Sequence, residues 1–184
     1  MTRPDVAYRS ETSPSTRPHS DVTVALELAG LAARHPELDE RLPAALDLLR
    51  DGLGFAHASA WRFSARRGGL VCERASGSLP HGVETANQRA LLREGDTLVG
   101  RALRTGAATA VADLGDEGHP WCEALAEAGL RGAVAVPYGS GDRRGVIAFA
   151  STDAVQPDAA RLASLEDLVL LATGAPTPGA DGLD

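Results

Sequence analysis

The residues of this chain best suited to chemistry lie in the segment Gly118-His119-Pro120-Trp121-Cys122. Pro120 favours the first turn of a helix, which would place Cys122 near a helix N-terminus with His119 three residues before it. A helix N-terminus and a nearby histidine both lower the pKa of a thiol, and the resulting thiolate is a nucleophile. The segment therefore predicts a reactive Cys122. The alternative is a partly buried cysteine that serves as a small apolar side chain.

The second cysteine and the histidines bear on disulfides, metals and haem. Cys72 and Cys122 are too few for a disulfide framework, and they lie far apart in the sequence. The five histidines show no H-x-x-x-H spacing, and no C-x-x-C pair occurs, so we predict no metal site. A single histidine such as His119 can serve as an axial ligand of haem, which leaves haem open as a cofactor.

Large rings and two charged residues are further candidates for a binding pocket. Only 4% of the residues are aromatic, so Trp61, Trp121 and Tyr138 stand out, with core filling as the alternative for Trp61. Arg101 and Asp113 border the same region; an arginine there could meet an anionic ligand, or it could form a surface ion pair. The predicted pocket residues are Trp61, Arg101, Asp113, His119, Trp121, Cys122 and Tyr138.

The elements that must position these side chains follow from the periodicity of the apolar residues. Helices are predicted over residues 21–35, 40–53, 84–93, 98–106, 121–128 and 158–173. Strands are predicted over residues 57–64, 70–75, 109–114, 132–138 and 145–152. The last two strands read as an antiparallel hairpin, so the order of elements predicts an α+β fold with a mostly antiparallel sheet rather than a doubly wound parallel one.

Composition and charge restrict the partners and the location. The net charge is −7, and no run of basic residues exceeds two, which argues against binding to nucleic acid. No apolar run reaches the ~18–20 residues that cross a membrane, and the N-terminus lacks the apolar core of a secretory signal, so we expect a cytoplasmic protein without membrane contact. Residues 1–20 and 174–184 are predicted to be disordered tails around a single domain at 21–173.

Three segments occur in an order and spacing that resemble the GAF domain family. They are LVGRALRTGAATAVADL at 98–114, AGLRGAVAVPY at 128–138 and RGVIAFAS at 144–151. The resemblance spans about residues 42–171 and implies the PAS/GAF type of α+β fold. Such a fold has about six mostly antiparallel strands flanked by helices, with the terminal helices packed together. It also implies a pocket for a small molecule or, alternatively, a module used only for dimerisation.

Two more specific resemblances concern Cys122. The free methionine-(R)-sulfoxide reductases, which are stand-alone GAF enzymes, have a similar G-H-x-x-C segment with a catalytic cysteine. Their second, resolving cysteine lies in a G-V-C-G turn, where this chain has Leu98-Val99-Gly100. GAF domains that attach a bilin place a histidine directly after the cysteine, where this chain has Glu123. Both departures count against transferring these roles to Cys122.

The terminal helices carry more apolar residues than one buried face requires. Surplus apolar surface on the helices at 21–35 and 158–173 favours a homodimer, or a contact with a protein partner in trans; packing of the two helices on each other is the alternative. The sequence therefore predicts a free-standing sensory domain that binds an unknown small molecule and signals through such contacts. The alternatives are a thiol-based redox enzyme using Cys122 and a module that serves only for interaction.

Overall fold

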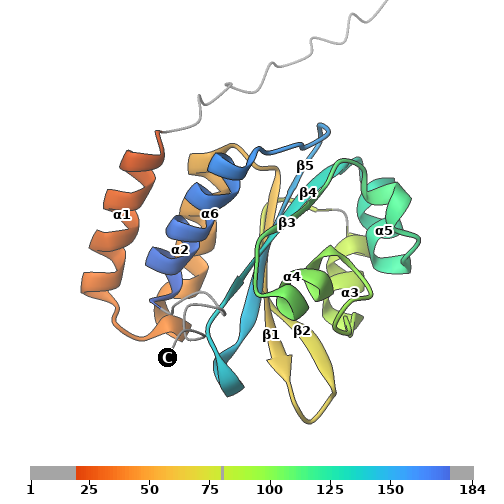
Figure 1. Ribbon diagram of the computed structural model, residues 1–184, viewed down its shortest axis with the longest axis horizontal. Coiled ribbons are helices and arrows are strands. Elements are labelled where there is room, and N and C mark those ends of the chain that lie inside the picture. Colours follow the sequence, from red (N-terminus) through yellow and green to blue (C-terminus); the bar gives the residue numbers. More distant parts are fainter. Residues whose placement is uncertain (1–19, 80, 175–184) are drawn as a thin grey trace, which may run out of the picture.

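The computed structural model describes residues 20–79 and 81–174 of the chain (Figure 1). The disorder predicted for residues 1–20 and 174–184 concerns residues that lie outside this part, except for Ser20 and Gly174. Ser20 caps the first helix, because its side chain accepts a hydrogen bond from the amide of Thr23. Gly174 caps the last helix in the left-handed conformation, with a φ of 66°. These two residues are therefore helix caps at the edges of the folded domain.

Within the described residues, five strands form one antiparallel sheet in the order β2-β1-β5-β4-β3. The resemblance implied about six strands. Next to β2, Leu70 exchanges two backbone hydrogen bonds with Leu92, which forms an isolated bridge and no sixth strand. The chain turns away soon afterwards at Gly95, whose φ of 95° favours glycine. The strands are β1 (His57–Ser64), β2 (Gly69–Ser76), β3 (Thr109–Val111), β4 (Gly132–Tyr138) and β5 (Gly145–Ser151).

Helices cover both faces of this sheet (Figure 1). One face carries α2 (Leu38–Leu53) and α6 (Ala159–Thr173), and α1 (Asp21–Arg34) packs on the outside of these two helices (Figure 1). The other face carries α3 (His81–Arg89), α4 (Leu98–Thr105) and α5 (Pro120–Glu127). Two short 3₁₀ helices, η1 (Leu114–Glu117) and η2 (Gly141–Arg143), lie in the connections. The predicted α+β fold is therefore confirmed.

The predicted strands agree with the structure to within one residue at each end, except for β3, which a polar side chain ends early. The bounds predicted for β1 and β4 are correct. The strand predicted over 109–114 ends at Val111, because the Asp113 side chain accepts a hydrogen bond from the amide of Gly115 and caps η1. A side chain that bonds to the nearby backbone offers the chain an alternative to pairing in a sheet.

The terminal helices contact each other, as predicted. Arg161 of α6 forms an ion pair with Asp21 of α1 at 2.7 Å, and Ser164 hydrogen-bonds to the same carboxylate. Val24 and Leu28 of α1 are buried in the core that α2 and α6 complete. Among the described helices, none is both long and apolar enough to cross a membrane.

Candidate functional site

The sheet face beneath α3, α4 and α5 is built from small side chains. In the antiparallel register, Ala150 lies opposite both His57 of β1 and Ala133 of β4. Ala148 likewise lies opposite Ser59 and Ala135, and residues directly opposite each other point to the same face. The other face carries Val134, Val136, Ile147 and Phe149. In the middle of β4 and β5, the alternation thus places alanines beneath α3–α5 and larger side chains on the opposite face.

Two tryptophans meet above this face of small side chains. Trp61 of β1 is 0% exposed and Trp121 of α5 is 5% exposed. Their ring centroids lie 5.1 Å apart at an interplanar angle of 81°, which is the favourable edge-to-face arrangement. Trp61 Nε1 donates to Ser59 Oγ at 2.9 Å, and Trp121 Nε1 donates to Asn87 Oδ1 at 2.7 Å. Four side chains from β1, α3 and α5 therefore form one connected cluster.

Three polar atoms at this cluster are buried without a partner. Asn87 Nδ2 and both ring nitrogens of His57 have no hydrogen bond of normal geometry to any residue that the structure describes. A buried polar atom without a partner costs about 1–3 kcal/mol, so such atoms are rare in folded proteins. His57 lies two residues before Ser59 on the same face of β1. The cluster thus extends along β1 with unused capacity for hydrogen bonds.

His57 is a neutral imidazole at physiological pH. Burial lowers the pKa of His57 to about 4, and the positive charge of Arg50 lowers it further, while the backbone of Ser76 offsets only part of this effect. A neutral imidazole has one donor and one acceptor nitrogen. At this position the ring can therefore give one hydrogen bond and accept another.

The two predicted charged residues form ion pairs at the edge of this face. Arg101 of α4 binds both carboxylate oxygens of Glu117, with distances of 3.0 and 2.8 Å. Glu117 also accepts from the amide of Leu98, which ties the start of α4 to η1. Asp113 pairs with Arg131 at 2.8 Å, and this hydrogen bond holds the pKa of Asp113 below its usual value. In this structure, the ion pairs of Arg101 and Asp113 stabilise the loops around the cluster.

His119 and Cys122 do not form a nucleophile and base pair. His119 caps α5, with Nδ1 accepting from the amide of Trp121 at 3.1 Å. Cys122 is fully buried, and that burial, together with Glu117, raises the pKa of its thiol to about 12. Cys72 is partly buried, and burial raises its pKa to about 11. Both cysteines are free thiols that stay protonated at neutral pH.

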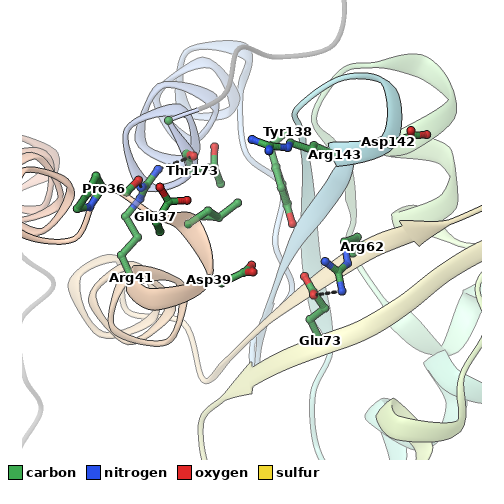
Figure 2. A pocket seen from close by; sticks show the side chains of 12 residues that line it. Pro36, Glu37, Asp39, Arg41, Arg62, Glu73, Tyr138, Asp142, Arg143 and Thr173 are labelled. Atoms are coloured by element: carbon green, nitrogen blue, oxygen red, sulfur yellow. Dashed lines mark hydrogen bonds and ion pairs between the residues drawn. The ribbon is translucent and has the colours of Figure 1, made fainter.

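Tyr138 lies apart from the other predicted pocket residues. Its side chain belongs to the core beneath α1, α2 and α6, and it lines a pocket of about 350 Å³ on that side of the sheet (Figure 2). The structure therefore brings together Trp61, Trp121 and Cys122, places Arg101, Asp113 and His119 around them, and puts Tyr138 on the opposite face. The described residues contain no group of three or more metal-binding side chains.

Sequence reasoning missed three residues of the cluster, which are His57, Ser59 and Asn87. His57 begins the same strand as Trp61 at an even spacing, so the alternation of β1 could have placed both side chains on one face. Asn87 carries no such signal, because α3 is a short polar helix and only its packing against α5 brings it to Trp121.

Comparisons with known proteins agree on the fold. The profile of the GAF domain family matches residues 35–175, and no curated protein matched the sequence significantly. The free methionine-R-sulfoxide reductase of Neisseria meningitidis, solved with its substrate, is 20% identical with a TM-score of 0.66, over 84% of this chain and 86% of that one.

Two further solved structures are similar over most of their length. The reduced form of the Staphylococcus aureus fRMsr has a TM-score of 0.69 at 18% identity, over 86% of this chain and 96% of that one. The GAF domain of a phosphoenolpyruvate-protein phosphotransferase from Coxiella burnetii has a TM-score of 0.65 at 17% identity, over 83% and 90%. At such identities the likeness establishes a common fold and leaves function to the site itself.

Proposed function

Because the chain belongs to the GAF domain family, we propose that it is a sensory domain that binds a small molecule between its sheet and helices α3–α5. The observation that carries this proposal is the buried Asn87 amide, which is bonded to Trp121 through Oδ1 while Nδ2 has no partner among the described residues. A ligand atom that accepts a hydrogen bond from Nδ2 would remove the cost of burying it unpaired.

The surrounding side chains indicate which kind of molecule would fit. Trp61 and Trp121 offer flat apolar surface for a ring, and His57 offers one donor and one acceptor. None of the side chains that form the cluster is charged. Arg101, at its edge, is already paired with Glu117. We therefore favour an uncharged or weakly polar ring compound with hydrogen-bond acceptors.

Binding would require the helices over the sheet to move, because both tryptophans are buried in the structure. A ligand that binds an open arrangement more tightly shifts the population toward it. The sheet side of α4 contacts β4 and β5, and the segment after α4 is tied to α6 by the bond from the Ala108 amide to Glu166 Oε1 at 2.8 Å. Movement of α4 would thereby reach α6 on the opposite face.

The terminal helices would pass this change to a partner. Val22 and Leu26 of α1 are 69% and 70% exposed, and Leu170 and Leu171 of α6 are also exposed. Exposed apolar residues on these helices fit a homodimer contact or a protein partner in trans. Light scattering across a range of concentrations measures whether the chain dimerises.

The two tryptophans of the cluster make ligand binding directly observable. The chain has no others, so its intrinsic tryptophan fluorescence comes from Trp61 and Trp121 alone. We expect native mass spectrometry of the purified protein to show a retained small molecule. We also expect its removal and re-addition to change the fluorescence. Asn87→Ala should weaken re-binding, and Gln88→Ala, an exposed neighbour on α3, should not.

A protein that retains no molecule, and whose fluorescence does not respond to nucleobases, nucleosides or other uncharged ring compounds, would contradict ligand sensing and favour an interaction-only module. The thiol-based redox alternative has no matching observation at Cys122, since that thiol is buried with a pKa raised to about 12. We therefore propose the sensory function alone.

A further inference from the structure

We propose that the pocket lined by Tyr138 is a second binding site, specific for a small organic amine. It lies across the sheet from the tryptophan cluster, between the start of α2, the end of α6 and the β4–β5 connection (Figure 2). Its volume of about 350 Å³ falls within the range of roughly 300–1,000 Å³ that is common for small-molecule pockets. The proposal stands independently of the ligand beneath α3–α5.

Two of the arginines that line this pocket are already engaged. Arg41 donates to the carbonyl oxygens of Ala172 at 2.8 Å and Thr173 at 2.6 Å, and so caps the end of α6. Arg62 forms an ion pair with Glu73 at 2.6 Å. These side chains shape the wall of the pocket. Glu73 neutralises the charge of Arg62, whereas the carbonyl partners of Arg41 leave its positive charge in place.

The charged side chains that remain at the rim favour a cation. Glu37, Asp39 and Asp142 carry carboxylates with no hydrogen bond or ion pair to any described residue, and Arg143 carries a guanidinium in the same condition. With Arg41 included, three carboxylates face two guanidiniums, which leaves an excess of one negative charge around the opening. An ammonium group entering the pocket would therefore meet an attractive potential.

The floor of the pocket provides a second and independent indication of a ligand. Tyr138 is 3% exposed, and its hydroxyl makes no hydrogen bond to any residue that the structure describes. Figure 2 shows this hydroxyl pointing into the pocket, toward the Arg62–Glu73 pair. The ring is buried while the hydroxyl oxygen opens to the pocket, so a group that enters the pocket can bond to it. An ammonium N–H donated to the Tyr138 oxygen would supply such a bond.

Two features keep this hydroxyl available. Gly145 lies opposite Tyr138 in the register of β4 and β5. A Cβ at this position would come within 2.6 Å of the hydroxyl oxygen, so any residue other than glycine would displace the tyrosine ring. Burial, with the charges of Glu73 and Asp39, raises the pKa of Tyr138 above its ordinary value. The group therefore stays a neutral hydroxyl, with lone pairs that accept from a cation.

The test compares a diamine with a dicarboxylate of equal length. Putrescine and succinate are titrated into the isotope-labelled chain at constant ionic strength, and amide shifts are followed by NMR. We expect saturable shifts with putrescine at residues 37–39, 138 and 142–143, and none with succinate. Tyr138→Phe and Asp39→Asn should each lower the affinity for putrescine about three- to tenfold. This is the effect of losing one hydrogen bond or one exposed charge contact.

Control variants outside the pocket test whether putrescine binds specifically at this site. Asp116→Asn, an exposed carboxylate of η1, should leave the affinity for putrescine unchanged, and so should Asn87→Ala in the tryptophan cluster. Asp39 is exposed, so Asp39→Asn tests the site even if Tyr138→Phe disturbs the core. Absence of saturation, stronger binding of succinate, or unchanged affinity in both site variants would each overturn the proposal.

Discussion

Arg41 is the side chain whose removal should damage this domain most clearly. It lies in the second turn of α2, is 5% exposed, and donates to backbone carbonyls from two distant parts of the chain. Nε and Nη2 bind the oxygens of Ala172 and Thr173, while Nη1 binds those of His35 and Pro36. Replacing it by methionine keeps much of the apolar stem and removes every one of these donors.

The expected cost follows from the two bonds at the end of α6, which are buried. A hydrogen bond to a charged group contributes about 1.5–3 kcal/mol, and two of them set an upper range of about 3–6 kcal/mol. The substitution also relieves the burial of the guanidinium, which offsets part of that loss. We therefore expect Arg41→Met to lower the free energy of unfolding by about 2–4 kcal/mol. For a domain of this size, the corresponding loss in Tm is roughly 5–15 °C.

Urea unfolding followed by tryptophan fluorescence measures this change, and hydrogen exchange locates it. The amides in the last turn of α6 should lose protection before those of β4 and β5. Arg34→Met is the matched control, because Arg34 is exposed near the end of α1 and should change stability by less than about 0.5 kcal/mol. An Arg41→Met protein whose free energy of unfolding lies within about 0.5 kcal/mol of the wild-type value would refute the reasoning.

Three further predictions concern single residues. The pKa of Cys122 is raised to about 12, so the thiol stays protonated at pH 7.4 and iodoacetamide should modify it only after unfolding. Rapid labelling of the native protein, or methionine sulfoxide reduction that is lost in Cys122→Ser, would show the site to be reactive. His57 has a pKa lowered from 6.5 to about 4, so the folded state resists protonation. About 3 kcal/mol of stability present above pH 6.5 should be lost as the pH falls toward 4, and a His57→Gln protein should lack this component in urea titrations. Gly100→Ala would drive a Cβ into the Arg93 carbonyl oxygen and should cost about 2 kcal/mol or more, whereas Gly82→Ala, with open space around it, should leave stability equal or slightly higher; equal melting temperatures for both variants would contradict the predicted clash.

Short-range sequence patterns were enough to predict most of the helices and strands. The alternation in residues 57–64 and the apolar runs at 132–138 and 145–152 predict three central strands, because side chains buried on a sheet repeat with the period of the backbone. The helix predicted over 158–173 is confirmed as Ala159–Thr173, and Asp158 is its cap, since its side chain accepts a hydrogen bond from the Arg161 amide at 2.8 Å. The helix predicted over 21–35 spans Asp21–Arg34, and Ser20 just before it is the cap.

The candidate site was less predictable, because its members come from separate elements. Trp61 and Trp121 were identified as prominent rings, yet their edge-to-face contact depends on how α5 packs over β1. Tyr138 was grouped with them, but the bond register of β4 turns its side chain to the opposite face, in line with Val134 and Val136. A shift of one residue along a strand exchanges the two faces, and the sequence near Tyr138 does not fix that choice.

The thiol shows the same division between local and tertiary information. The sequence by itself determined that Cys122 lies in the first turn of a helix after Pro120, because capping and proline preferences act over a few residues. Only the tertiary structure decided that the thiol is buried beside Glu117 and that His119 turns its Nδ1 to the helix amides. Desolvation and charge act through space, so the pKa of a group depends on neighbours that the chain brings together only when it folds.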